Sequence, residues 1–455
     1  MEEEQTASKK IYYIAGGIIL FLIIGGVVVF SLMGRNDPSK SPVFSWPFGN
    51  NINPNGDPAN DSALLPSNEG DEQNLIDQAG KKLRQLSTIP SAGAIALQNS
   101  TGAQTVRFVA KETGNIHDVD ISTLQTNRVT NTAIPRVEQA FFMNEGKNVI
   151  LQYVAEPETI KTVYTQIVPA TGENIGHLET SFLPDNITSL SVSPNGKEVF
   201  FLVQSSTGVV GFTLTPPKTL SGYISCPSTP CKQVFNFPFS EWNTEYFGNT
   251  QILLTTKPAV GIQGFAYTLD TSSGALTRVL GNTNALTTHT DFSGKKFLFS
   301  ELQENTTVLR IATPENKAGS HDPYVIMPFN TLPEKCTWGT SADILYCGAP
   351  SDTYKGNLPD NWYQGIMPSV DTIWKYTISN SETTIASAPQ IDAGVELDTT
   401  YPFISAGTNE NLIFTNKTDS TLWALSLHPE QQSNRDDSLP SEQSDILGST
   451  PESKK

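Results

Sequence analysis

The sequence predicts an all-β protein: a β-propeller of about seven blades, with six or eight also open, preceded by one N-terminal transmembrane helix. Three observations predict it. One long uncharged run lies near the N-terminus, a strand–turn–strand unit recurs in the middle of the chain, and polar segments without periodicity flank that middle region. At 455 residues the chain could hold two or three ordinary domains, but a repetitive β fold can take up nearly all of it.

The N-terminal run is long enough to be a membrane anchor. Residues 11–33 read IYYIAGGIILFLIIGGVVVFSLM and contain no charged side chain. A helix of that length crosses a hydrocarbon core of roughly 30 Å. A cleaved signal peptide is the alternative, but its apolar region is usually shorter and ends at small residues, whereas this run ends in bulky apolar ones. We therefore expect one spanning helix, with residues 1–10 in the cytoplasm.

The cysteines orient this helix better than its flanking charges, because the Lys and Arg residues on its two sides nearly balance. The four cysteines form two local pairs, Cys226 with Cys231 and Cys336 with Cys347. The second pair encloses a strand, turn and strand, which would set its members opposite each other across a hairpin. A structural zinc site is the alternative, but it usually needs C-x-x-C spacing. We expect two disulfides, and hence a single-pass cell-membrane protein whose C-terminal domain is extracytoplasmic.

Two polar segments flank the expected domain. Residues 34–89 are rich in Asn, Pro, Ser, Asp and Gly, which predicts a flexible stalk, and its segment 75–86 could form a short helix. Residues 429–455 are polar, acidic and without periodicity, which predicts a disordered tail. The folded domain is expected between them, over residues 90–428.

This domain contains a repeated unit of two apolar strands joined by a tight turn. The clearest copies are SLSVSPNGKEVFFLV at residues 189–203 and HTDFSGKKFLFSEL at residues 289–302. Asn-Gly or Ser-Gly supplies the positive φ of a tight hairpin, and the flanking apolar residues can bury against neighbouring units. The turns mostly recur at roughly the 40 to 50 residues of a four-stranded propeller blade. Weaker copies lie at residues 139–153, 245–256, 336–347 and 403–416.

A second hairpin follows most of these turns and ends in a more polar strand, which we expect at the outer edge of each blade. Examples are residues 264–280, 372–386 and 106–121. The six turn units, together with one blade begun near residues 94–121, give the count of about seven blades.

The turn sequences carry a resemblance to a known repeat. Ser193-Pro194-Asn195-Gly196-Lys197 and Phe292-Ser293-Gly294-Lys295-Lys296 resemble the WD40-like repeat of periplasmic propellers of the TolB kind and of dipeptidyl-peptidase-like propellers. The resemblance covers most of residues 90–428 and implies a fold. Its members act as interaction scaffolds or as gating domains beside a hydrolase, and the repeat itself contains no catalytic residue.

The charge of the chain bears on its partners. Acidic residues outnumber basic ones by 46 to 29, for a net charge of -17, and no basic block follows the N-terminus. A nucleic-acid partner is therefore not expected, because phosphate binding needs clustered positive charge. The acidity could favour a basic partner, or could serve only the solubility of an exported domain. We expect another envelope protein, a peptide or a glycan as partner, and the membrane as a second contact through residues 11–33.

The sequence contains no motif that specifies a reaction. It lacks the G-x-S-x-G elbow, the phosphate-binding loop, the H-E-x-x-H pair and the EF-hand loop. We therefore name no catalytic, cofactor-binding or metal-binding residue. His289 with Asp291 is the pair to examine first, although such turn residues more often bind backbone. The histidines are scattered along the chain, at His117, His177, His289, His321 and His428.

One long insertion could form a ligand-binding loop. Asp360, Asn361, Trp362 and Tyr363 lie in it, and long loops on a propeller face often carry function. The other interpretation is that Trp362 and Trp374 fill space between blades. The leading hypothesis is a non-enzymatic binding or scaffold module of the cell envelope. The alternative is a propeller hydrolase or lyase acting on glycans, with carboxylates gathered at the mouth of the channel.

Overall fold

The computed structural model describes residues 78–428, except residues 156–158, 173–174, 221, 313–323, 351–357, 406 and 408–409. The expected anchor at residues 11–33, most of the stalk and the tail at residues 429–455 lie outside this range. Among the described residues, no helix combines the length and the apolar character that a membrane crossing requires.

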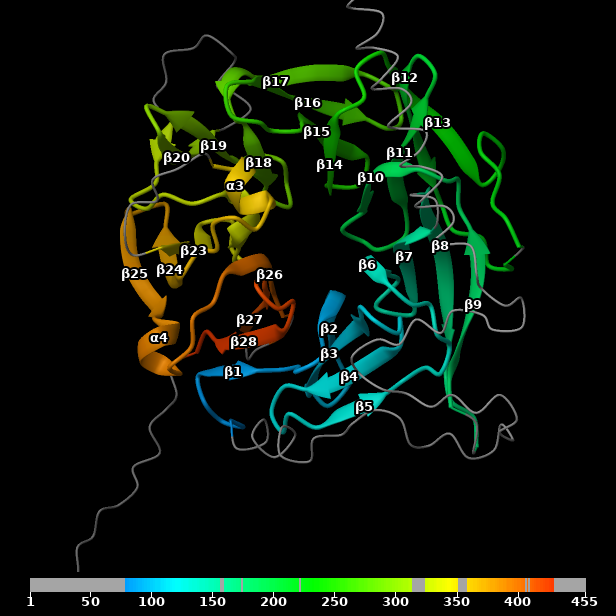
Figure 1. Cartoon of the computed structure of the whole chain (residues 1–455), viewed down its shortest axis with the longest axis horizontal. Coiled ribbons are helices and arrows are strands. Elements are labelled where there is room, and N and C mark those ends of the chain that lie inside the picture. The colour runs from blue at the N-terminus through cyan, green and yellow to red at the C-terminus, as the bar shows by residue number, and fades with distance from the viewer. Residues whose placement is uncertain are drawn as a thin grey trace, which may run out of the picture. The chain divides into compact units, whose positions relative to one another are not determined.

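Seven four-stranded antiparallel sheets form the domain and surround a common centre (Figure 1). The predicted β-propeller of about seven blades is therefore confirmed, with seven. The strands, in order from the inner to the outer edge of each blade, are as follows: blade 1, β2 (Ser91–Gln98), β3 (Gln104–Ala110), β4 (Ile116–Asp120) and β5 (Thr126–Arg128); blade 2, β6 (Val137–Met143), β7 (Asn148–Ala155), β8 (Thr159–Val168) and β9 (His177–Phe182); blade 3, β10 (Ile187–Val192), β11 (Val199–Ser205), β12 (Gly208–Leu214) and β13 (Cys231–Phe237); blade 4, β14 (Trp242–Phe247), β15 (Gln251–Thr256), β16 (Gln263–Asp270) and β17 (Leu276–Asn284); blade 5, β18 (Thr287–Thr290), β19 (Phe297–Gln303), β20 (Thr306–Ala312) and β21 (Val325–Ile326); blade 6, β22 (Cys336–Trp338), β23 (Ile344–Pro350), β24 (Asp371–Thr377) and β25 (Glu382–Ser387); blade 7, β26 (Thr399–Ile404), β27 (Asn411–Asn416), β28 (Leu422–Ser426) and β1 (Leu83–Gln85).

Blade 7 combines both ends of the described chain. Its three inner strands come from the C-terminal side, whereas its outer strand, β1, comes from the N-terminal side and pairs with β28 (Figure 1). The short helix that residues 75–86 could form is therefore wrong at Leu83–Gln85, where the chain is a strand. Leu83 and Arg84 are buried there, and the pairing with β28 outweighs local helix preference.

The core of the ring lies between the blades. Of the clusters of buried apolar side chains in the described residues, seven lie between blades, one at each contact between neighbouring blades. The cluster between blades 3 and 4, for example, joins Phe200 and Phe235 to Trp242 and Ile252. A sheet that buries both faces needs apolar residues on both, which explains the near-continuous apolar runs of the second strands, such as Val199–Ser205.

The predicted turn units form the first hairpin of blades 2 to 7, as expected. Gly196 and Gly294 in the clearest turns have φ of +68° and +67°. A Cβ at Gly196 would lie 2.7 Å from Asn144 N of the preceding blade, so the turn needs glycine both for its φ and for this close approach. Residues 106–121 correct the expectation of an outer hairpin, because they are β3 and β4, the middle strands of blade 1.

Both predicted disulfides are present. Cys226 bonds to Cys231 at the start of β13, and Cys336 bonds to Cys347 across the hairpin of β22 and β23, where the two are direct register partners. These bonds fix one loop of blade 3 and the innermost strand of blade 6.

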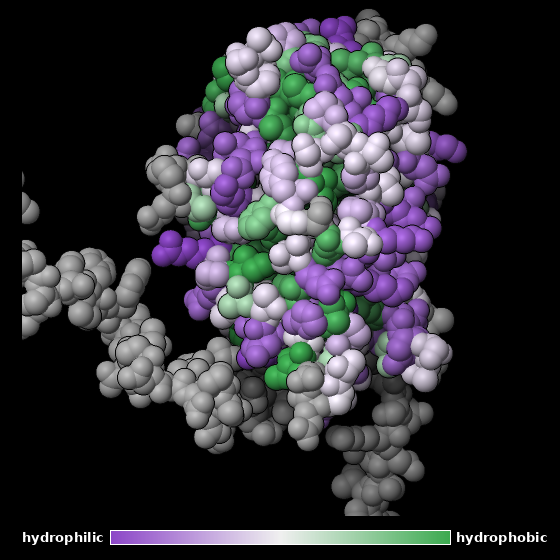
Figure 2. Space-filling view, turned by 90° about the vertical axis from the view of Figure 1, so that its right-hand side faces the viewer, coloured by the Kyte–Doolittle hydropathy of each residue, from purple (hydrophilic) through white to green (hydrophobic). Residues whose placement is uncertain are grey.

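Connections between blades and the loops between second and third strands open on the same face of the propeller, because successive strands run in opposite directions. We call this the α3 face, after the short helix α3 (Asp360–Tyr363) in the loop between β23 and β24. Two more short helices lie in blade connections on this face, η1 (Pro333–Lys335) before β22 and α4 (Pro389–Asp392) before β26. The outer rim exposes both kinds of residue. On the side shown in Figure 2, hydrophobic residues are interleaved with hydrophilic ones. In the outer strand β9, buried residues lie between exposed ones.

Closure of the ring by β1 predicts a stability effect. We expect Leu83→Ala to lower the free energy of unfolding by about 2–4 kcal/mol in a urea titration, because Leu83 is buried between blades 6 and 7. Thr126→Ala, at an exposed position of the outer strand of blade 1, serves as the control and should change it by less than about 0.5 kcal/mol. Equal effects of the two substitutions would show that β1 does not hold the ring together.

Candidate functional site at the centre of the α3 face

The loop between β23 and β24 crosses from blade 6 toward blade 4. In the view of Figure 1, α3 overlaps β18 of blade 5. Val260 N, in the loop between β15 and β16 of blade 4, donates hydrogen bonds of 3.3 and 3.2 Å to the two carboxylate oxygens of Asp360. A helix of four residues has little stability of its own, so contacts of this kind must hold it in place.

Trp362 is the main fixing point of α3. Its indole is 3% exposed and packs with Leu332 and Leu358. Trp362 Nε1 donates to both carboxylate oxygens of Asp398, at 2.9 and 3.0 Å. Lys335 and Lys417 also lie over the ring, with their Nζ atoms 5.1 and 5.0 Å from its centroid. Trp362 is therefore a buried packing residue of the loops on this face.

A buried ion network lies beneath Trp362. Lys335 Nζ pairs with Asp371 Oδ2 at 2.8 Å and with Asp398 Oδ1 at 2.5 Å, and all three side chains are at most 3% exposed. Backbone N–H groups of Ser369 and Thr399 also donate to these carboxylates. Burial and the neighbouring Asp398 raise the pKa of Asp371, although Lys335 opposes this shift. One cation thus balances two buried carboxylates, so the network depends strongly on Lys335.

A second group of polar side chains lies toward the axis, and we call it the central cluster: Glu245, His289, Glu334, Tyr363 and Tyr401. They come from β14, β18, η1, α3 and β26. His289 Nδ1 lies 2.8 Å from Glu245 Oε1, and the Tyr363 hydroxyl donates to Glu334 Oε1. The η1 segment that carries Glu334 contacts both β18 and β26. The ring therefore brings together residues from four blades.

The pKa shifts show that these groups affect one another. Burial raises the pKa of Glu334, which the hydroxyl of Tyr363 and the charge of His289 partly oppose. Burial works against the charged form of His289, but Glu245, and then Glu334 and Asp291, raise its pKa. Burial and Glu334 raise the pKa of Tyr401, although its side chain is 68% exposed.

The structure places the predicted site residues as follows. Asp360 binds the loop of blade 4, the amide nitrogen of Asn361 lies 3.3 Å from the sulfur of Met367, Trp362 is buried, and Tyr363 is 41% exposed and reaches Glu334. Their role in ligand binding stays a prediction. His289 pairs with Glu245, whereas Asp291 accepts hydrogen bonds from Ser293 and Lys296 within its own turn. The suggested pair of His289 with Asp291 is therefore not a hydrogen-bonded pair.

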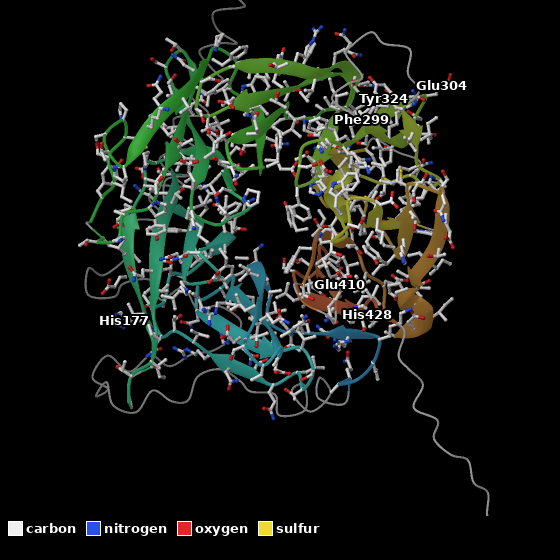
Figure 3. All side chains as sticks on the ribbon, turned by 180° about the vertical axis from the view of Figure 1, so that it is seen from behind. His177, Phe299, Glu304, Tyr324, Glu410 and His428 are labelled. Atoms are coloured by element: carbon white, nitrogen blue, oxygen red, sulfur yellow. A yellow bond between two sulfur atoms is a disulfide. The ribbon has the colours of Figure 1, made fainter. Side chains whose placement is uncertain are left out.

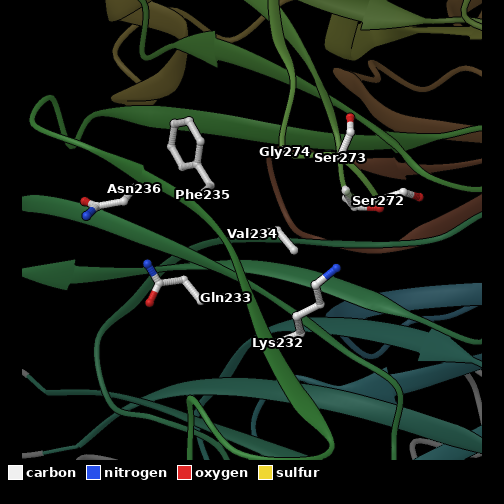
Figure 4. A pocket seen from close by; sticks show the side chains of 9 residues that line it. Lys232, Gln233, Val234, Phe235, Asn236, Ser272, Ser273 and Gly274 are labelled. Atoms are coloured by element: carbon white, nitrogen blue, oxygen red, sulfur yellow. The ribbon is translucent and has the colours of Figure 1, made fainter.

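The other described histidines lie elsewhere, and Figure 3 shows His177 and His428 well apart. Within the described part of the chain, no group of three or more His, Cys, Asp or Glu residues has an arrangement that could hold a metal ion. A groove of about 390 Å³ lies at the rim, between β13 and the turn that joins β16 to β17 (Figure 4). Lys232 is the sole titratable side chain in its lining, so this groove offers no evident chemistry.

Comparison with known proteins identifies no family. No family model and no curated protein matches the sequence. Solved structures with a similar fold include oligogalacturonate lyase from Vibrio parahaemolyticus, which is 8% identical with a TM-score of 0.47, covering 78% of this chain and 96% of that one. TolB from Acinetobacter baumannii is 10% identical with a TM-score of 0.34, covering 73% and 78%. The Cps50 (Swd1) β-propeller domain from Myceliophteria thermophila is 8% identical with a TM-score of 0.44, covering 76% and 100%.

The expected TolB- or WD40-like propeller is confirmed as a fold by the seven blades themselves. At 8–10% identity these similarities concern the fold alone. The site must therefore be interpreted from its own residues.

The charge balance of the ion network predicts an unusual pH response. We expect Lys335→Met to lower the free energy of unfolding at neutral pH by about 3–5 kcal/mol, because it leaves two adjacent buried carboxylates without their cation. Part of this loss should be recovered as the pH falls, since protonation of Asp371, whose pKa burial raises, removes its repulsion with Asp398. Lys161→Met, at the more exposed pair with Asp185, should cost less than about 1 kcal/mol. Urea titrations at several pH values test both expectations, and a pH-independent loss in Lys335→Met would contradict the assigned balance.

The coupling of Glu334 to His289 is measurable by NMR. We expect Glu334→Gln to lower the pKa of His289, because the charge of Glu334 contributes to raising it. His117 in blade 1 is the internal reference, and its pKa, which burial and Arg128 lower, should not change. Stability follows from the same shift. The contribution of protonated His289 to the free energy of unfolding is complete below the ordinary imidazole pKa of about 6.5. It is lost as the pH rises through the raised pKa of the folded protein. An unchanged His289 titration would show that Glu334 is not near it.

Proposed function

We propose that this protein is a membrane-anchored, extracytoplasmic β-propeller that acts as a binding or scaffold module of the cell envelope and contacts another envelope protein through its α3 face. The two disulfides support an oxidising compartment, and the uncharged run at residues 11–33 supports an anchor. The observation that carries the proposal is the set of large apolar side chains exposed on the loops of this face, namely Phe239, Ile262, Tyr363, Ile366, Val370 and Ile391.

Two of these side chains lie in loops that contact each other. Ile262 and Ile366 are 57% and 64% exposed and lie in the two loops that the hydrogen bonds to Asp360 hold together. Exposed apolar side chains gathered on one face, rimmed by polar groups, are typical of a protein-binding surface. The buried network under Trp362 fixes one of these loops, so the loop loses less conformational entropy when a partner binds.

A propeller enzyme acting on glycans is the second candidate, and the central cluster favours it. Hydrolysis of a glycosidic bond commonly uses two carboxyl groups, one of them an acid with a raised pKa. Glu334 has a raised pKa, and both Glu334 and Glu245 act on the charge of His289. This candidate requires turnover of a glycan by the wild-type protein and its loss in Glu334→Gln.

The binding proposal is tested by capture of partners with the full-length tagged protein from its native membranes. We expect wild type to retain a specific envelope protein, and the double variant Ile262→Ser, Ile366→Ser to retain at least about ten-fold less, since two apolar contacts are lost. The control is Val325→Ser, Ile326→Ser on the outer strand β21, where the exposures are 41% and 58%.

Equal retention by both double variants would refute the assignment of the α3 face. If no specific partner is captured, and the wild-type protein turns over a glycan while Glu334→Gln does not, the glycan enzyme becomes the better-supported function.

A further inference from the structure

The side chain of Glu334 leaves one polar atom unsatisfied. Its Oε1 accepts the hydroxyl of Tyr363, but its Oε2 is buried and has no hydrogen-bond partner outside Glu334 itself. A buried acceptor without a partner costs about 1–3 kcal/mol, and more when it is charged. Native structures rarely keep such a cost without a functional reason. The atom therefore indicates that something else donates to Glu334 in the working protein.

The charges around Glu334 indicate what that donor is. Within the described part of the chain, no Lys or Arg forms an ion pair with Glu334 or Glu245. The adjacent Lys335 is fully engaged with Asp371 and Asp398. His289 is the one cationic group paired within the cluster, and it binds Glu245. Two carboxyl groups thus lie near one imidazole, and no second cationic side chain of the described residues pairs with them.

Two aromatic rings complete the environment. Tyr363 is 41% and Tyr401 is 68% exposed. Burial raises the pKa of both phenols, and the charge of Glu334 raises it further. Both phenols therefore remain neutral at physiological pH, and their rings can face a cation. Tyr401 has φ of +48°, a conformation that non-glycine residues adopt only where the surroundings impose it. Its strand, β26, contacts the η1 segment that carries Glu334.

We propose that the central cluster binds a cationic side chain of the protein partner, an arginine, with its guanidinium on Glu334 Oε2 and against the ring of Tyr401. A guanidinium fits better than an ammonium because it presents several donors in one plane and stacks on aromatic rings. A neutral sugar could donate a hydroxyl to Glu334, but it would not supply the second cation that the two carboxyl groups lack. The inference rests on the proposed function, since it adds the central contact to the apolar surface around it.

Binding of short capped peptides to the full-length protein in nanodiscs tests this inference by calorimetry and by the NMR signals of His289. The probes are Gly-Gly-Arg-Gly-Gly and its matched Gly-Gly-Gln-Gly-Gly. We expect the arginine peptide to bind wild type at least about ten-fold more tightly than the glutamine peptide, because only the former makes a charge-assisted contact. Added salt should weaken its binding.

Variants separate the groups involved. Glu334→Gln should lower the affinity for the arginine peptide by at least about ten-fold, and Tyr401→Leu should lower it by several-fold. Tyr401→Phe keeps the ring and should retain the affinity. Glu145→Gln, at a side chain that is 85% exposed in a turn of blade 2, is the matched charge control and should have no effect. Thermal unfolding of each variant shows that it is folded, and the exposed Tyr401 substitutions provide the test if Glu334→Gln unfolds the protein.

Equal affinity for both peptides, or undiminished affinity in Glu334→Gln and Tyr401→Leu, would overturn the inference. Absence of any peptide binding would also overturn it. If the envelope partner were still captured in a manner that depends on Ile262 and Ile366, the proposed function would stand without the arginine contact.

Discussion

The burial of apolar side chains between neighbouring blades is the interaction on which the rest of the structure depends. Each blade has two apolar faces and can bury them only against a blade on either side, so an open arc would leave two faces in water. The ring must therefore close. Closure is achieved in blade 7, where β1 from the N-terminal side pairs with β28 near the C-terminal side.

Closure also creates the site. Residues on β14, β18, η1 and β26 approach one another only because the ring brings blades 4 to 7 around one centre. The loop that carries α3 can then reach from blade 6 to Val260 of blade 4. The network of Lys335, Asp371 and Asp398 lies beneath Trp362 of this loop and holds it in place. A buried ion network of this kind adds less to stability than apolar packing would, but it specifies one position for the loop. Tyr363 is thereby presented at the centre of the α3 face.

The features that sequence reasoning predicted are those determined by local residues. The hairpins, the turn glycines and the partnership of Cys336 with Cys347 follow from residues close together in the chain. β1 was missed because a three-residue strand has no periodicity, and its partner lies at the other end of the domain. The central cluster was missed for a related reason: Glu245, Glu334 and Tyr401 carry no local motif. His289 was noticed, but with the wrong partner.

We propose that this propeller meets its partner at the centre of the α3 face. Photo-crosslinking in intact cells tests this directly. One variant carries a photoreactive amino acid at position 363, and a second variant carries it at position 292. Phe292 is 63% exposed but lies in a first-hairpin turn, on the opposite face. We expect a discrete crosslinked envelope protein from position 363 and none from position 292. The same crosslinked product from both positions, or from position 292 alone, would contradict it.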